Sequence, residues 1–175
     1  MQNHEWRFNR IVVGLDGSPG SAHAVQWAIA LAKRTGAEII ATHVLQPVTT
    51  EYSGMFGFIA PVSLDTWVAE IRQQFEEEWC LPLYRADVPF RKRFETGSAG
   101  QRLIEVSERE VAGLIVTGTR GLGPVREAFL GSVSHYLIQH ARVPVVVVPP
   151  DRTVPVREAA AVVGARPIPM SGVPS

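Results

Sequence analysis

Three glycines and a serine stand at a spacing that suits a bound phosphate. Gly118 and Gly121 enclose two residues, and Gly131 and Ser132 follow after nine more. Glycine lets a backbone approach a phosphate closely, and serine adds a hydroxyl donor. Ser132 opens a segment in which Val133, Leu137 and Ile138 have helical spacing, so the second pair stands where a helix starts. Free N–H groups and a partial positive charge make a helix start a natural anion site, and the pattern therefore predicts phosphate binding there.

Two charged residues near these turns each allow two interpretations. Arg120 lies inside the glycine segment, where it either adds a positive charge to the phosphate site or points into water. Asp16 follows the first apolar run and precedes a helix, so it either contacts a ligand or caps that helix. The glycines themselves also suit plain turn geometry, and the residue types alone leave these alternatives open.

The elements that must hold these residues alternate between two periodicities. Short apolar runs at 10–16, 37–45, 88–95, 113–117 and 143–148 predict strands, and segments at 18–34, 63–85, 98–111 and 132–140 have helical spacing. Pro82 predicts a break near the end of the second helix. This order predicts an α/β protein with an open, doubly wound, five-stranded parallel sheet and helices on both faces. Ligands of such sheets bind beyond the carboxyl ends of the strands, which points to the turns after the first and fourth strands.

The length and the proline distribution predict one domain and a tail. The chain has 175 residues, which suits a single domain, here residues 1–150. Residues 151–175 contain four prolines and lose the periodic pattern, so we expect a mostly disordered C-terminal tail. Residues 46–61 form a long connection rich in Gly, Thr and aromatic residues, of the kind that often serves in binding.

The composition excludes several classes of function. Seventeen basic and 17 acidic residues balance to zero net charge, which gives no electrostatic case for a nucleic acid or an anionic membrane as partner. The single cysteine, Cys80, excludes a disulfide framework and a zinc site of several thiolates. No apolar run approaches the roughly 18 residues of a membrane-spanning helix. We expect a soluble cytoplasmic protein.

The chain lacks the motifs of the common nucleotide-dependent enzymes. It has no G-x-x-x-x-G-K-[ST] loop and no G-x-G-x-x-G fingerprint. Its five histidines are scattered, and His135 and His140 do not have the i, i+4 spacing of a helical metal site. With no obvious catalytic base, general acid or metal cluster, the sequence predicts binding with slow or negligible hydrolysis.

Four segments together resemble the universal stress protein family in its ATP-binding form. They are the glycine spacing described above, IVVGLDGSPGS at 11–21, THVLQP at 42–47 and PVVVVP at 144–149. The resemblance covers about residues 8–150. It implies a Rossmann-like fold, a nucleotide-dependent regulatory role in the stress response and at most weak ATPase activity.

The resemblance also implies roles for individual residues. Asp16, Leu15 and Val44 would surround the adenosine part of ATP, and Gly118, Gly121, Gly131 and Ser132 would hold the ribose and phosphates. Thr117, Val133 and, less specifically, Arg120 would complete the site. Mg²⁺ would arrive with the phosphates and need few ligands from the protein.

The last strand suggests how the molecule associates. Residues Val143 to Val148 are strongly apolar and should lie at an edge of the sheet, which is open to association. The family covers this edge with a second subunit, so we expect a two-fold homodimer there. Three other possibilities remain open: a homodimeric interaction module that binds no nucleotide, a pocket for AMP or cyclic AMP, and an adenylate-using enzyme.

Overall fold

The computed structural model describes residues 8–46, 64–119 and 130–149. Its strands are β1 (Arg10–Gly14), β2 (Glu38–Leu45), β3 (Phe90–Thr96), β4 (Leu114–Gly118) and β5 (Val145–Val148). Its helices are α1 (Pro19–Thr35), α2 (Leu64–Gln74), the π-helical segment η1 (Phe75–Trp79), α3 (Leu81–Ala86), α4 (Ala99–Arg109) and α5 (Ser132–His140). All five predicted strands and the four predicted helical regions are present, with bounds shifted by a few residues.

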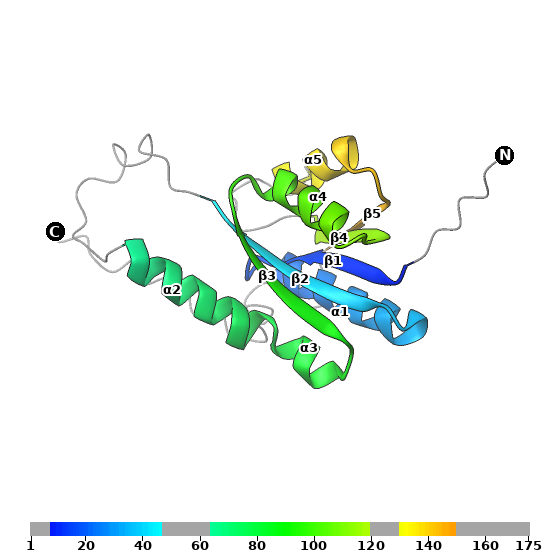
Figure 1. Ribbon diagram of the computed structural model, residues 1–175, viewed down its shortest axis with the longest axis horizontal. Helices are drawn as coiled ribbons and strands as arrows, with labels where there is room; N and C mark the ends of the chain where they lie inside the picture. Colours follow the sequence, from blue (N-terminus) through cyan, green and yellow to red (C-terminus); the bar gives the residue numbers. More distant parts are fainter. Residues whose placement is uncertain (1–7, 47–63, 120–129, 150–175) are drawn as a thin grey trace.

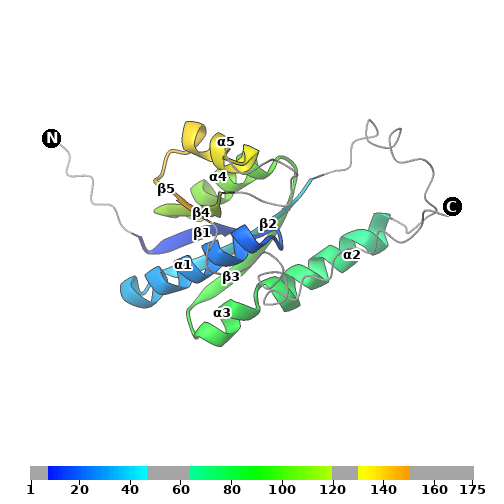
Figure 2. The same ribbon diagram turned by 180° about the vertical axis from the view of Figure 1, so that it is seen from behind.

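The strands form one parallel sheet in the order β3-β2-β1-β4-β5 (Figure 1). The winding reverses at β1, which lies between β2 and β4. Helices α1 and α3 and the segment η1 cover one face of the sheet, and α4 and α5 cover the other. Figure 2 shows the molecule from the α1 side. The predicted fold class is confirmed, and β5 lies at an edge of the sheet, as expected. β3 forms the other edge.

The first helix begins and ends where the sequence predicts. The Ser18 hydroxyl caps α1 by accepting from the N–H of Ser21 at 3.1 Å, and Pro19 takes the first helical position. Gly36 ends the helix with φ at 70°, a left-handed conformation in which its N–H donates to the Ala32 carbonyl.

The second predicted helix is not one helix. The single helix predicted over 63–85 is divided, and the change begins at Phe75, seven residues before Pro82. The π-helical segment η1 turns both Phe75 and Trp79 into the core, while Glu77 between them stays exposed. Proline then stands in the first turn of α3, where its missing N–H costs nothing. Packing of two large rings against the sheet thus overrides the regular α-helical period.

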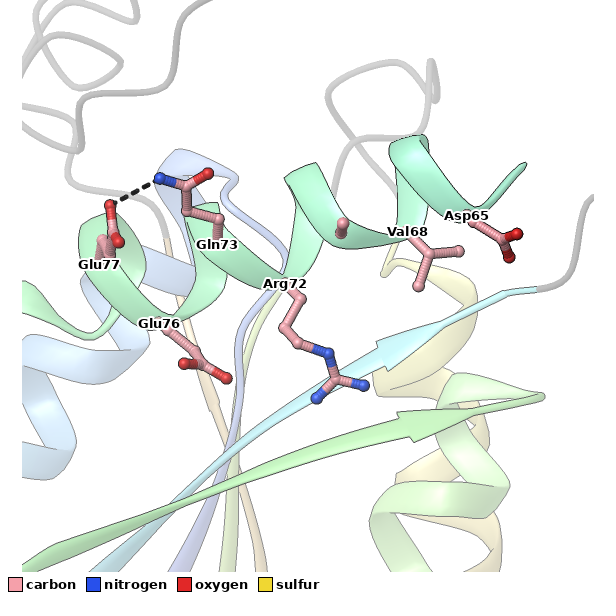
Figure 3. A pocket seen from close by; sticks show the side chains of 7 residues that line it. Asp65, Val68, Arg72, Gln73, Glu76 and Glu77 are labelled. Atoms are coloured by element: carbon pink, nitrogen blue, oxygen red, sulfur yellow. Dashed lines mark hydrogen bonds between the residues drawn. The ribbon is translucent and has the colours of Figure 1, made fainter. Parts of the chain in front are cut away.

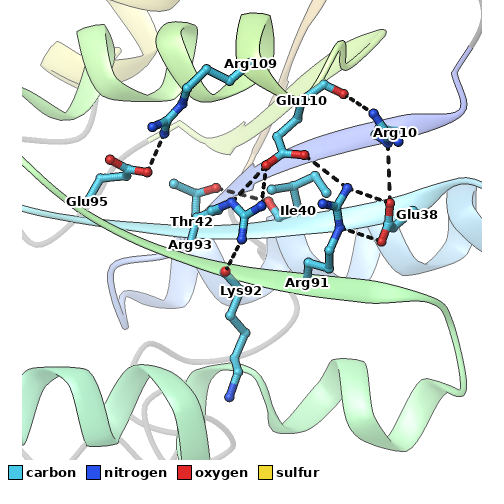
Figure 4. Close-up of polar contacts among 10 residues, drawn as sticks. All are labelled: Arg10, Glu38, Ile40, Thr42, Arg91, Lys92, Arg93, Glu95, Arg109 and Glu110. Atoms are coloured by element: carbon cyan, nitrogen blue, oxygen red, sulfur yellow. Dashed lines mark hydrogen bonds and ion pairs between the residues drawn. The ribbon is translucent and has the colours of Figure 1, made fainter.

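A network of ion pairs joins the amino ends of three strands to α4 (Figure 4). Arg91 binds Glu38 at 2.7 Å and Glu110 at 3.0 Å, and Arg93 binds Glu110 at 2.6 Å. The Arg10 guanidinium donates to the carbonyl of Glu110 at 2.7 Å. Buried Glu110 therefore connects β1, β2 and β3 at the end of the sheet opposite to the predicted site.

Three predictions concern segments outside the described residues. They are the long connection at 46–61, of which only residue 46 is described, the interior of the glycine segment with Arg120 and Gly121, and the tail at 151–175. Within the described part of the chain, no helix is both long enough and apolar enough to cross a membrane.

Candidate functional site

The predicted site residues that the structure describes gather at the carboxyl edge of the sheet. Because β1 lies between β2 and β4, the turn that follows it borders the ends of both. The N–H of Leu15 donates to the Thr42 carbonyl of β2 at 2.9 Å. On the other side, a β-carbon placed on Gly118 of β4 would lie 2.6 Å from the backbone of Gly20 in α1. Segments about 100 residues apart in the sequence thus meet at one place.

Asp16 forms part of a tight turn between β1 and α1. Its Oδ1 accepts from the N–H of Ser18 at 3.0 Å, and its own N–H donates to the Ser21 hydroxyl at 3.3 Å. Gly17 has φ at 76°, and a β-carbon there would lie 2.7 Å from the Trp79 ring. The N-cap of α1 is Ser18, so the capping interpretation of Asp16 is wrong. Asp16 instead holds the backbone N–H of that N-cap residue, and its contact with a ligand stays a prediction. A carboxylate accepts about four hydrogen bonds, so Asp16 retains acceptor capacity toward a ligand.

Neither glycine of the motif that the structure describes adopts the left-handed conformation that favours glycine. Neither Gly118 nor Gly131 has a positive φ, and Gly131 lies at −63°, which any residue adopts. Gly118 is instead required by its contact with Gly20.

Ser134 holds the start of α5 against the end of β4, and sequence reasoning missed it. Its buried hydroxyl donates to the Gly118 carbonyl at 2.7 Å. The N–H of Gly131 donates to the Thr119 carbonyl, also at 2.7 Å. The two ends of the glycine segment are thus joined by hydrogen bonds. The only signal in the sequence was a second serine two residues after Ser132.

Helix α5 begins with backbone donors that no side chain among the described residues caps. Its N-cap is Gly131, Ser132 is exposed, and the first intrahelical bond within this turn runs from the His135 N–H to the Gly131 carbonyl at 2.9 Å. The N–H groups of Ser132, Val133 and Ser134 are those that a helix leaves without an internal partner. Together with the Ser132 hydroxyl, they fit an anionic group, as the sequence predicts.

The remaining predicted residues are wholly or partly packed into the core. Leu15 is buried on the α1 face of the sheet, while Val44 and Val133 are partly buried in the cluster on the α4 face. Thr117 is buried, and its hydroxyl lies 4.0 Å from where a Gly14 β-carbon would be. Val44 and Val133 come from different elements to the same face, and Thr117 points toward β1.

His43 is a second functional candidate that sequence reasoning missed. It is buried near the end of β2, and its Nδ1 lies 2.7 Å from the Leu15 carbonyl. Burial lowers the pKa of His43 below its ordinary value, although the hydrogen bond to Leu15 and the charge of Asp16 oppose this. The sequence offered only a histidine among the mostly apolar residues of this strand.

A surface hollow is lined by none of the residues described above. It has a volume of about 400 Å³ and runs along α2 and η1 (Figure 3). Arg72 points into it, with its guanidinium 4.1 Å from the centre of the Phe94 ring. None of the predicted site residues lines it. Among the described residues, no group of three or more His, Cys, Asp or Glu side chains is placed to hold a metal ion.

Comparison with known proteins identifies the family. Residues 7–149 match the model of the universal stress protein family. The chain belongs to the universal stress protein family. Universal stress protein YxiE of Bacillus subtilis is 29% identical over 148 residues, which cover 81% of this chain and 99% of that protein. Universal stress protein Rv1996 of Mycobacterium tuberculosis is 35% identical over 178 aligned positions, which cover 93% of this chain but only 55% of that protein.

Solved structures of universal stress proteins share the fold. A universal stress protein in complex with cAMP superposes with a TM-score of 0.58 at 22% identity, covering 83% of this chain and 99% of that one. A universal stress protein family member from Arabidopsis thaliana with AMP bound has a TM-score of 0.54 at 15% identity, covering 83% and 93% of the two chains. Protein MJ0577 reaches a TM-score of 0.66 at 20% identity, covering 82% and 96%.

Proposed function

We propose that this universal stress protein binds ATP at the carboxyl edge of its sheet and acts as a nucleotide-dependent regulatory module in the stress response. The observation that carries the proposal is the meeting of two features at one edge, the Asp16 turn and the uncapped start of α5. Two family members of the same fold, solved with cAMP and with AMP, support an adenine nucleotide as the ligand.

The residues at this edge fit the two ends of a nucleotide. Asp16 offers carboxylate oxygens, which accept hydrogen bonds from the hydroxyl or amino groups of adenosine. Val44 offers an apolar surface for the base. The N–H groups at the start of α5 and the Ser132 hydroxyl are donors, which phosphate oxygens require. Arg120 and Gly121 complete the phosphate end in this proposal, and Mg²⁺ arrives bound to the phosphates.

In this proposal the protein acts by binding ATP, and its hydrolysis of ATP is weak or absent. The sequence offers no obvious catalytic base. Burial raises the pKa of the Cys80 thiol to about 12, so this thiol is unsuited to nucleophilic attack. A bound nucleotide instead stabilises one arrangement of the turns that it touches, and this shifts the population of conformations.

The sheet edge supports a homodimer as the working assembly. Among the residues that the structure describes, β5 pairs with β4 alone, and Val145, Val146 and Val147 are partly exposed. An apolar edge strand of this kind pairs readily with another chain, so we propose a two-fold dimer through Val143 to Val148 in the cytoplasm.

Calorimetric titration with ATP and Mg²⁺ tests the proposal, after any copurified nucleotide has been removed and identified. The matched variant is the double substitution Gly131→Ala and Ser132→Ala. Because Gly131 has an ordinary φ, alanine there leaves the fold intact while it crowds the phosphate end. Saturable binding by the wild type that the variant loses supports the proposal. Absence of binding by folded, nucleotide-free wild type overturns it and favours a nucleotide-free interaction module.

Two further measurements separate the alternatives within the pocket. Titration with AMP and cyclic AMP ranks the ligands, because only ATP supplies a triphosphate for the start of α5. Release of phosphate from ATP, measured at saturation, distinguishes a binding module from an adenylate-using enzyme.

A further inference from the structure

We infer that His43 is the positioning residue for the nucleoside end of the site, because it holds the turn that presents Asp16. This inference rests on the proposed function and adds how the site keeps its geometry. Its evidence is the set of contacts that surround the imidazole, which joins the end of β2 to the turn after β1.

The first contact fixes the residue before Asp16. A carbonyl only accepts hydrogen bonds, so His43 Nδ1 carries the proton and donates it to the Leu15 carbonyl at 2.7 Å. The N–H of the same Leu15 donates to the Thr42 carbonyl at 2.9 Å. Both backbone groups of Leu15 are therefore held by adjacent residues of β2, and the chain leaves the sheet at a defined point.

The second contact fixes the residue after Asp16. The His43 ring packs edge-on to Trp79, with the ring centres 5.0 Å apart. A β-carbon on Gly17 would lie 2.7 Å from that same indole, so the turn rests directly on it. His43 and Trp79 thus support the turn on both sides of Asp16: His43 contacts Leu15, and Trp79 packs against Gly17.

Aromatic rings enclose the imidazole from the remaining elements. Phe94 of β3 and Phe75 of η1 lie 5.3 and 5.9 Å from it, centre to centre. Among the described residues, Asp16 is the charged group whose charge affects the pKa of His43. The desolvation that lowers the pKa of His43 keeps the ring neutral at pH 7, with its single proton on Nδ1.

Packing among these aromatic rings requires only a ring of similar size, which phenylalanine would supply in place of His43. The imidazole adds one polar function, and that function is directed at the turn. His43 is also the residue immediately before Val44, so the same short stretch of β2 supports Asp16 and Val44, two of the predicted contacts with adenosine.

Binding of ATP to four variants of the full chain tests the inference, each checked for folding by circular dichroism. His43→Phe keeps a ring and removes the donor, and His43→Asn replaces Nδ1–H with an amide N–H at a similar distance from the backbone. Asp16→Ala and the double variant Asp16→Ala with His43→Phe complete a thermodynamic cycle. We expect His43→Phe to weaken ATP binding about five- to tenfold, the effect of losing one well-placed hydrogen bond, and His43→Asn to recover most of it.

The cycle separates positioning from a merely structural role. If His43 acts through Asp16, then His43→Phe costs little further affinity once Asp16 is alanine. Independent, multiplicative losses, or unchanged binding by His43→Phe, overturn the inference while the proposed function stands. A wild type that binds no ATP overturns both. If His43→Phe does not fold, nitrogen-15 spectra of the wild-type imidazole decide: protonated Nδ1 that shifts on ATP addition supports the inference, and protonated Nε2 contradicts it.

Discussion

A β-carbon added to Gly118 would lie 2.6 Å from the carbonyl carbon of Gly20, so β4 and α1 touch through bare backbone. The atom met is main chain, which cannot rotate away. This contact joins the two turns of the candidate site and gives Gly118 a structural requirement of its own.

Gly118→Ala should therefore destabilise the protein whether or not a nucleotide is bound. Overpacking of this kind costs about 1 to 3 kcal/mol. Urea unfolding without nucleotide measures it, with Gly131→Ala as the matched control. Because Gly131 has φ at −63°, that control should change the free energy of unfolding by less than about 0.5 kcal/mol. Equal stability of the two variants would mean that the backbone contact yields.

Val111→Gly should stabilise the protein. Val111 follows α4 with φ at 50° and is 79% exposed, so its branched side chain is strained and contributes little burial. A left-handed conformation costs a non-glycine residue about 1 to 2 kcal/mol, part of which glycine returns through a more flexible unfolded chain. We expect a net gain of about 0.5 to 1 kcal/mol in urea unfolding. Val111→Ala is the control, since it keeps a β-carbon, and an equal gain in that variant would assign the effect to something other than φ.

Glu110→Gln should reduce stability at neutral pH and flatten its loss in acid. Burial raises the pKa of Glu110. The hydrogen bonds and charge of Arg93 and the charges of Arg91 and Arg10 lower it by more, so the pKa lies below its ordinary value. A carboxyl with a lowered pKa contributes stability above its ordinary pKa, and the contribution is lost as the pH falls through the folded-state value. Urea unfolding between pH 7 and pH 3 measures both effects.

The control for the Glu110 prediction is another paired glutamate. A hydrogen bond from Arg102 lowers the pKa of Glu105, but that pair lies on the surface of α4 and solvent screens it. Glu105→Gln should therefore leave the pH profile close to that of the wild type. A profile for Glu110→Gln that matches the wild type would show that the network is replaceable.

Val147→Pro should dissociate the proposed dimer. Pro144 and Val148 carbonyls bond to β4, so in a parallel ladder Val146 also faces β4, while Val147 directs its N–H away from the sheet. Proline removes that outward donor and spares the pairing with β4. Light scattering after gel filtration should show a monomer for Val147→Pro and a dimer for the wild type. Val147→Ala keeps the N–H and should remain dimeric, and a dimeric Val147→Pro would place the interface elsewhere.

The sequence by itself predicted the strands, most of the helices and the edge of the sheet at which the candidate site lies. Ser18 and Gly36 act within a few residues of their own positions, so the limits of α1 could be predicted from local chemistry. The glycine spacing and the alternation of strands and helices likewise predicted where a phosphate end would lie.

Tertiary structure alone decided which residues support that site. The contacts of Gly118 with Gly20, of Gly17 with Trp79 and of His43 with Leu15 join segments far apart in the chain. They depend on β1 lying between β2 and β4, and no local period encodes that order. The same holds for η1, where burial of Phe75 and Trp79 against the sheet outweighs the preference of an isolated chain for a regular α-helix. Local preference is a property of neighbouring residues, whereas packing depends on partners that only the folded chain brings together.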